Sequence, residues 1–516
     1  MLRQVAKQTN FYTVLYNRIP ENHILKVINS AVSFDFVNKL LESSYCKNLG
    51  RPAKEPEMML RISVLQDLYD LSDERVMDET EVNLAYMWFI GINPDEALPH
   101  PSLLAKFRTM RLKDIQMDDI ITEIVRQCIE KGIIKEENGI SSDTMHILAN
   151  TTKKVPERIM KHLAKKIFKA MDKTDYEIPD YTQIEDHKEA KRVMKEYLEE
   201  VMEKADESAE KEVAETKEIL ESPLFMEQKG IRSIVDTDAR VGYKSKTDSF
   251  FGYKMEYALT TDGRLITGVG VHNGAYVDGD DFSRLYELSK RAGLKINAAY
   301  ADKAYFRKEI LDMLAAENVA AYIPVNACTY KINEELFRYN KDSDQWICKR
   351  GNMTVSKKTK TIRRKDRGEV QHYEYIFGKE ECVGCPFREE CIKSAKTKAK
   401  RLCVGLNAAE YYEHSQWAKT EEFLEEYKKR AGIEGKNGEL KRFHGLDRAD
   451  GYGLRSVTLQ SKLSALAVNL KRIARLVTLK SSENVGFPAV LDGFLIVFGK
   501  FADLKAPTRK LEGAAA

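Results

Sequence analysis

The chain has 516 residues, of which 43% are hydrophobic, so it is long enough for more than one domain and a sizeable core. Its 83 basic and 80 acidic residues leave a formal net charge of only +3, so any surface that binds nucleic acid must be local. The longest apolar run, 489–498, is short and contains Asp492, and residues 1–4 lack the apolar core of a signal peptide. We therefore expect a cytoplasmic or nucleoid-associated protein without a membrane partner.

Residues 1–130 are expected to form a helical N-terminal domain that binds DNA. Apolar residues at helical spacing predict a helix over 59–69, and a second helix is predicted over 73–90, with Gly91 at its C-cap. The helix that Ser102 opens has a basic face, which carries Lys106, Arg108 and Arg111. Two interpretations stay open: a helix-turn-helix with this helix in a DNA groove, or a helical bundle with a solvated basic face.

A strand with an acid at its centre is predicted within 135–150, where Asp143 stands among apolar residues at alternating positions. The interval that follows, 151–228, is dense in lysine and glutamate. Its alternating charges are typical of solvent-exposed helices, and we interpret it as a helical insertion.

Regular structure resumes over 229–328 with the order strand, hairpin, helix, strand, helix, strand. Asp262-Gly263 lies at the predicted tip of the hairpin. Asp302 follows the apolar strand 296–301, and the ends of buried strands are where open α/β sheets carry their chemistry.

Residues 329–403 interrupt this pattern with a cysteine-rich insertion. Cys382, Cys385 and Cys391 have the spacing C-x2-C-x5-C, and Cys348 is the preferred fourth member, with Cys403 as the alternative. Four thiolates suit a closed structural zinc site, so the segment is predicted to resemble a zinc ribbon. Unliganded thiols and an iron–sulfur cluster are the remaining interpretations.

The segment 404–478 is predicted to hold the last helices of the core, with an apolar seam from Leu459 to Ile473, ahead of a tail over 479–516. At offsets of 0, 3, 7 and 14 it contains Tyr427, Arg430, Glu434 and Lys441. At about 100° per residue, these offsets keep the four side chains within roughly 60° of one another on a helix. A carboxylate that can hold a metal beside cations that can hold phosphates indicates phosphodiester chemistry.

The order Tyr-x2-Arg-x3-Glu-x6-Lys resembles the signature of the DDE transposases of bacterial insertion sequences, in which the Glu is the third metal-binding acid. Asp302-Lys303-Ala304-Tyr305 resembles the second-acid motif of that family, and the strand around Asp143 resembles its first-acid strand. The resemblance implies an α/β fold with an RNase H-like core, a mixed five-stranded sheet flanked by helices. It also implies that the N-terminal helical region binds the terminal repeats of the element.

The same resemblance implies cleavage at the ends of the element and strand transfer of the 3′-hydroxyl into target DNA. Asp143, Asp302 and Glu434 would hold two Mg²⁺ or Mn²⁺ ions, and Tyr427, Arg430 and Lys441 would hold the DNA. The implied partners are double-stranded DNA, as terminal inverted repeats and as target, and a second copy of the chain in a homodimer.

Three alternatives stay open at this point. Asp236 or Asp238 could replace Asp143 as the first acid, because a hairpin also follows them directly. The chain could be a retired transposase that only binds DNA, although acids stand at all three positions. It could also be a nuclease that performs no strand transfer.

Overall fold

The computed structural model describes residues 11–46, 52–222, 225, 230–245, 247–364, 368–392, 394 and 397–485. The first ten residues and 486–516, which include most of the predicted tail and its apolar run, lie outside the described residues.

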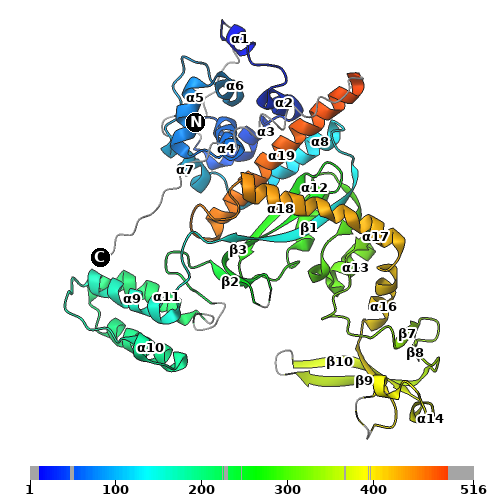
Figure 1. Ribbon diagram of the computed structural model, residues 1–516. Coiled ribbons are helices and arrows are strands. Elements are labelled where there is room, and N and C mark those ends of the chain that lie inside the picture. The colour runs from blue at the N-terminus through cyan, green and yellow to red at the C-terminus, as the bar shows by residue number, and fades with distance from the viewer. Residues whose placement is uncertain are drawn as a thin grey trace.

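A mixed β-sheet forms the centre of the molecule (Figure 1). Its strands are β1 (Glu137–Leu148), β2 (Arg240–Tyr243), β3 (Ser249–Thr260), β4 (Ile266–Asn273), β5 (Lys295–Tyr300) and β6 (Ala320–Tyr322). They lie in the order β4-β3-β1-β5-β6, with β2 paired to the start of β3. Strand β3 is antiparallel to β1 and β4, whereas β5 is parallel to β1 and β6. This is the order of an RNase H-like core, so the predicted mixed sheet is confirmed, and β2 is an addition to it.

Helices cover both faces of this sheet. Helices α12 (Phe282–Arg291) and α13 (Lys308–Ala316) connect β4 to β5 and β5 to β6. The two crossovers advance in the same direction across the sheet, so both helices lie on one face. Helices α18 (Ala431–Phe443) and α19 (Leu454–Val485) cover the opposite face, where their apolar residues pack against Met145 of β1 and Tyr257 of β3.

The N-terminal region is helical, as predicted. Its helices are α1 (Phe11–Tyr16), α2 (Ile24–Ala31), α3 (Phe36–Leu41), α4 (Pro56–Tyr69), α5 (Asp73–Val82), α6 (Leu84–Ile90), α7 (Ser102–Met110) and α8 (Asp114–Glu130). The single helix predicted over 73–90 is wrong, because Asn83 ends α5 and its side chain accepts a hydrogen bond from Ala85 N at 2.9 Å, which caps α6. These helices share one continuous hydrophobic core with α19 and the sheet, so they are not a separate unit from the central domain.

Two insertions extend from the sheet (Figure 1). The charged interval contains α9 (Pro156–Ala170), α10 (His187–Glu203) and α11 (Glu210–Glu221), which enclose a small hydrophobic core of their own. The cysteine-rich insertion contains β7 (Phe337–Asn340), β8 (Gln345–Cys348), β9 (Thr354–Arg364), β10 (Gly368–Phe377), α14 (Lys379–Val383), α15 (Arg388–Cys391) and β11 (Arg401–Gly405). Its core surrounds the fully buried Trp346. Helices α16 (Ala408–Trp417) and α17 (Glu421–Tyr427) then lead back to the sheet.

Candidate active site

The register of two parallel strands brings two acids together. Ser141 of β1 pairs with Tyr300 of β5, and Asp143 and Asp302 each lie two residues further along their own chain segments. Neighbouring strands are about 5 Å apart, so both carboxylates leave the sheet at the same place. Asp302 accepts a hydrogen bond from Ala304 N at 2.8 Å, which fixes its side chain at the turn after β5. Electrostatic repulsion by Asp302 contributes to the raised pKa of Asp143, consistent with this proximity.

The carboxylate of Asp143 is largely buried and has three polar partners. Its Oδ2 atom accepts a hydrogen bond from Asn437 Nδ2 at 3.1 Å and lies 3.4 Å from Arg430 Nη2, while Oδ1 accepts from Thr144 N at 2.9 Å. Burial raises the pKa of Asp143, and the Arg430 charge and these hydrogen bonds oppose that rise.

The segment that carries the third acid is not the uninterrupted helix that was predicted. Helix α17 ends at Tyr427, a 3₁₀ turn spans Lys428–Arg430, and α18 begins at Ala431. Despite this break, Arg430 Nη1 lies 2.9 Å from Glu434 Oε1, so one guanidinium stands between the carboxylates of Asp143 and Glu434. Burial lowers the pKa of Arg430, but the negative charges of Asp143, Asp302 and Glu434 raise it by more, so the net shift is upward.

Tyr427 completes this group. Its half-buried ring stacks on Phe423 at 5.8 Å between ring centroids. Burial raises the pKa of the Tyr427 phenol, Arg430 opposes that rise, and the negative charges of Asp302, Asp143 and Glu434 add to it. The phenol is therefore a neutral hydrogen-bond donor beside the three acids.

Lys441 lies further along α18 and contacts a different residue. Its Nζ atom is 3.3 Å from the ring nitrogens of His146 on β1. Burial and the Lys441 charge lower the pKa of His146 to about 4, so the imidazole is neutral and can accept a hydrogen bond from the ammonium. Lys441 therefore lies seven residues beyond Glu434 on α18 and contacts β1 at His146 instead of the three acids.

Asn437 and His146 are two candidate site residues that the sequence did not single out. A usable signal exists for Asn437, because it follows Glu434 by three residues and so shares its helix face. His146 carries no such signal, since its contact with Lys441 spans 295 positions of the chain.

The basic residues predicted to bind DNA from α7 differ in their availability. Arg108 pairs with Asp73 at 2.5 Å and donates to Gln66 at 3.0 Å. Arg111 donates to the Ser44 carbonyl and lies 4.5 Å from the centroid of the Tyr45 ring. Lys106, in contrast, is exposed. The two arginines hold the helices together, which leaves Lys106 as the residue of this set best placed to meet DNA.

The rival first acids have structural partners. Asp236 is 1% exposed and accepts hydrogen bonds from the Tyr253 hydroxyl, Ala239 N and Gly453 N. Asp238 accepts from Leu454 N at 2.8 Å, the first residue of α19. Both acids therefore secure the start of the long helix α19, which favours Asp143 as the first acid.

The acid cluster has the donor chemistry of a magnesium site. Three carboxylates supply hard oxygen ligands of the kind that Mg²⁺ and Mn²⁺ prefer. Within the described residues, no three histidine, cysteine or acidic side chains converge closely enough to hold one ion. At the acids, the Arg430 guanidinium lies between Asp143 and Glu434 and offsets part of their combined negative charge.

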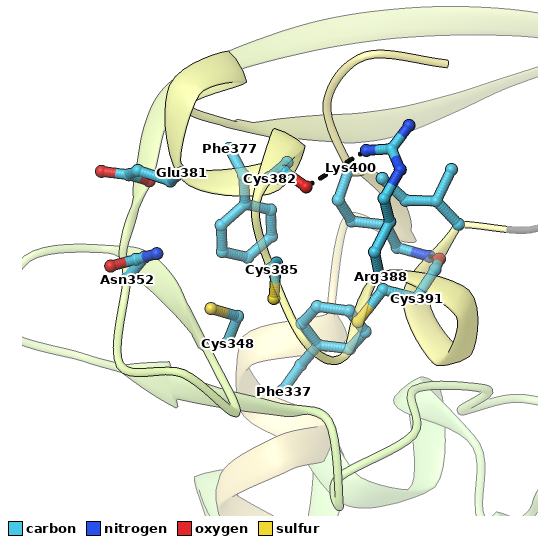
Figure 2. Close-up of a pocket in the computed structure, with 11 residues that line it drawn as sticks. Phe337, Cys348, Asn352, Phe377, Glu381, Cys382, Cys385, Arg388, Cys391 and Lys400 are labelled. Atoms are coloured by element: carbon cyan, nitrogen blue, oxygen red, sulfur yellow. Dashed lines mark hydrogen bonds between the residues drawn. The ribbon is translucent and has the colours of Figure 1, made fainter. Parts of the chain in front are cut away.

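The four predicted zinc ligands line one small cavity of about 30 Å³ in the cysteine-rich insertion. Figure 2 shows Cys348, Cys385 and Cys391 around this space beside the rings of Phe337 and Phe377. All four are free thiols, and burial raises the pKa of Cys391, with Cys385 and Cys348 adding to the rise. The alternative ligand Cys403 is exposed on β11 and does not line the cavity.

Comparison with known families identifies two segments of the chain. Residues 13–110 match the profile "Transposase domain (DUF772)", and residues 347–474 match the profile "Transposase DDE domain". The second match includes Tyr427, Arg430, Glu434 and Lys441 and the four cysteines, whereas Asp143 and Asp302 lie between the matched segments. The segment that carries the third predicted acid thus matches a DDE transposase domain.

Other comparisons are more distant. No curated protein matches the chain. A cryo-EM structure of the piggyBac transposase synaptic complex with hairpin DNA is 10% identical and covers 95% of this chain and 86% of that one, with a TM-score of 0.28. That likeness is too distant to assign a function. Among the described residues, no helix has the length and apolar character needed to cross a membrane.

Proposed function

We propose that the chain is a transposase that cuts DNA at the ends of its own element and joins the freed 3′-hydroxyl to target DNA. The observation that carries this proposal is the meeting of Asp143, Asp302 and Glu434 around Arg430, from two adjacent strands and a helix on an RNase H-like core. The DDE transposase domain over 347–474 supports the same conclusion independently.

In this proposal Asp143, Asp302 and Glu434 hold divalent metal, Mg²⁺ or Mn²⁺, two ions per site. When bound, the metal supplies a Lewis acid for the attacking and the leaving oxygen of the phosphodiester. The protein's own part is to fix the three carboxylates. Asn437 and Thr144 N hold Asp143, and Ala304 N holds Asp302.

Arg430 and Tyr427 are the proposed phosphate contacts next to the reacting bond. The guanidinium that now pairs with two carboxylates is free to donate to phosphate oxygens once those carboxylates have another cation as partner. The neutral Tyr427 phenol donates to the same backbone, and Lys441 neutralises a phosphate further along the strand. Lys106 on α7 would contribute to binding the terminal repeats.

Because two element ends must be joined to one target, we infer a homodimer that holds both terminal inverted repeats. A nuclease without strand transfer is the nearest alternative, and it shares every feature of the acid cluster. Product analysis separates the two functions, since only a transposase yields joined strands.

The cysteine cavity is proposed to hold one structural zinc ion. The four thiols line the same cavity without converging closely enough to hold an ion as they stand, and their number and type match the ligand set of closed zinc sites, so the ion would draw them together. The ion would hold β8, α14 and α15 together at the end of the insertion and would take no part in the chemistry.

The test is cleavage and strand transfer with DNA that carries the inverted repeats flanking the gene. Asp143→Asn, Asp302→Asn and Glu434→Gln should each abolish both products while leaving folding and DNA binding intact, since size is kept and only charge is removed. Glu425→Gln is the matched control, because Glu425 on α17 is 69% exposed and paired with a lysine, much as Glu434 is 67% exposed and paired with Arg430. Normal cleavage by all three variants would overturn the proposal.

A further inference from the structure

Strand β9 of the cysteine-rich insertion is an exposed basic edge. Among its eleven residues are five basic and no acidic side chains, namely Lys357, Lys358, Lys360, Arg363 and Arg364. In the described part of the chain, β9 forms a ladder only with β10, and beyond Thr354, whose carbonyl accepts a hydrogen bond from Gln345, its other edge has no strand partner. The chain as a whole has a net charge of only +3, so this strand is a strong local concentration of positive charge.

Neighbouring carboxylates neutralise only part of this charge. Lys357 pairs with Asp344 and lies over the Tyr373 ring, so its charge is used in contacts within the insertion. On the other face of the strand, Glu374 is the cross-strand neighbour of Lys358 and forms ion pairs with Lys360 and Arg401. One carboxylate therefore stands among three cations.

Two basic residues stand opposite glutamates of β10, Lys358 opposite Glu374 and Arg363 opposite Glu369, without forming ion pairs with them. Within the residues that the structure describes, neither Lys358 nor Arg363 forms an ion pair, and both are exposed. They are five positions apart on a strand, an odd offset, so they lie on opposite faces. The strand thus offers cations on both sides of the β9–β10 hairpin.

The hairpin is fixed relative to the active site. Trp346 in the core of the insertion lies 5.6 Å from Tyr412 of α16, measured between ring centroids. On the same helix, Tyr411 lies 4.9 Å from Phe306, which follows the Asp302 turn in the catalytic core. Figure 1 shows the β9–β10 hairpin projecting beyond α16, on the side of the sheet away from the N-terminal helices. The insertion is thus packed against the core that carries Asp302, and its hairpin is a surface separate from the N-terminal helices.

We propose that β9 is a DNA-contacting arm, which binds the phosphate backbone of duplex DNA running through the active site. This inference rests on the proposed function and adds a partner surface to it. Side chains on one face of a strand repeat about every 6.8 Å, and duplex DNA carries one negative charge per about 1.7 Å of its axis. Lys358 and Lys360 on one face of the strand and Arg363 on the other can meet phosphates whatever the base sequence, so the arm supplies affinity without sequence preference.

Edge lysines also have a second known effect, which is to prevent edge-to-edge pairing of exposed strands. The two roles give different results when charge is removed. Loss of a DNA contact weakens binding and its salt dependence, whereas loss of edge protection leaves binding intact and causes self-association.

The experiment compares Lys358→Gln/Arg363→Gln with wild type and with the control Lys188→Gln/Lys217→Gln. The control removes the same charge from exposed lysines on α10 and α11 that form no ion pair within the described residues. Binding of a fluorescein-labelled, random-sequence duplex is followed by anisotropy over a range of salt concentrations, and self-association by size-exclusion chromatography.

We expect the arm variant to bind more weakly at low salt, with a slope of log K against log salt shallower by about 2, one for each lost phosphate contact. The control should match wild type. An unchanged slope in the arm variant, an equal loss in the control, or aggregation with unchanged affinity would each overturn the proposal. If wild type itself neither binds the duplex nor cuts end-containing DNA, the proposed function fails as well. If wild type does both and the arm variant binds equally well, the arm alone is refuted.

Discussion

Asn437 on α18 donates a hydrogen bond to Asp143 on β1 at 3.1 Å, across 294 positions of the chain. The Tyr257 hydroxyl of β3 in turn donates to Asn437 Oδ1 at 2.9 Å. These two bonds join two strands and the helix of the third acid, so the Asn437 amide sets the position of α18 over the carboxylates.

Replacing this amide should therefore damage stability and activity together. Asn437→Ala removes one hydrogen bond from the buried Tyr257 hydroxyl, which keeps the Ile433 carbonyl, and one from Asp143, which keeps Arg430 and Thr144 N. Loss of the two bonds should lower the free energy of unfolding by about 1–3 kcal/mol in urea titrations and reduce cleavage. Tyr257→Phe removes the bonds from the hydroxyl to Asn437 and to the Ile433 carbonyl but leaves the bond to Asp143, so as the control it should reduce cleavage less. Wild-type stability and cleavage in Asn437→Ala would show that this link does not position the site.

Arg430 should matter more for joining strands than for binding DNA. A charge-assisted hydrogen bond contributes about 1.5–3 kcal/mol, which corresponds to about 10–100-fold in rate when it is lost at the reacting phosphate. We expect Arg430→Ala to lower strand transfer by that factor, measured as joined product, with a much smaller change in duplex affinity.

Arg430→Lys is the matched control, because it keeps the charge but loses the planar fork that contacts two oxygens at once. It should recover part of the lost activity. Lys441→Ala should show the same pattern as Arg430→Ala but more weakly, since Lys441 contacts His146 and not the acids. Equal losses of binding and transfer in Arg430→Ala would contradict this role.

Asp67 should make stability depend on pH. It lies on α4 and accepts a hydrogen bond from Ser464 of α19 at 3.0 Å. Burial, with Asp450 and Asp70 nearby, raises the pKa of Asp67 from 3.8 to about 7. Because the folded state holds this proton more tightly than the unfolded state, the contribution to stability is complete below about pH 4 and is lost as pH rises to about 7.

The measurement is the free energy of unfolding of wild type minus that of Asp67→Asn between pH 4 and pH 8. The difference should fall through this window, because the asparagine cannot ionise. Ser464→Ala removes a hydrogen bond that favours the carboxylate, so it should extend the fall to higher pH. A constant difference across the window would mean that Asp67 ionises in the folded protein without cost.

The zinc site gives a prediction with a direct readout. Purified protein should contain one zinc per chain by elemental analysis, and chelation should make four further thiols reactive, those of Cys348, Cys382, Cys385 and Cys391. Cys385→Ser should lose the metal and lower the melting temperature, whereas Cys403→Ser, at an exposed cysteine outside the cavity, should do neither. Metal-free protein with all exposed thiols reactive from the start would exclude the site.

Much of the fold could be predicted from local pattern. Strands with apolar runs, the Asp262-Gly263 turn and the seam from Leu459 to Ile473 are signals that lie within a few residues of the elements they define. The positions of Asp143 and Asp302 near the ends of paired segments follow from the same patterns, because adjacent parallel strands present their carboxyl ends together.

What sequence could not provide are contacts between distant segments and small backbone choices. The ion pair between Arg108 and Asp73 depends on how α5 and α7 pack. The sequence alone therefore overestimates how many basic side chains of α7 are free to bind DNA. The split at Asn83 and the 3₁₀ turn before α18 are single-residue capping and geometry effects within segments of helical composition. Arg430 standing between two acids likewise depends on the approach of α18 to β1.

The most direct test of the central claim is a change of metal preference at the three acids. Mg²⁺ demands oxygen ligands, whereas Mn²⁺ accepts a sulfur ligand more readily. Cleavage of end-containing DNA is measured in Mg²⁺ and in Mn²⁺ for Asp143→Cys, Asp302→Cys and Glu434→Cys, with Glu425→Cys as control. We predict that the three site variants are inactive in Mg²⁺ and recover part of their activity in Mn²⁺, while the control cuts normally in both. Equal activity of the site variants in the two metals, at wild-type level, would contradict the claim that these carboxylates hold the catalytic metal.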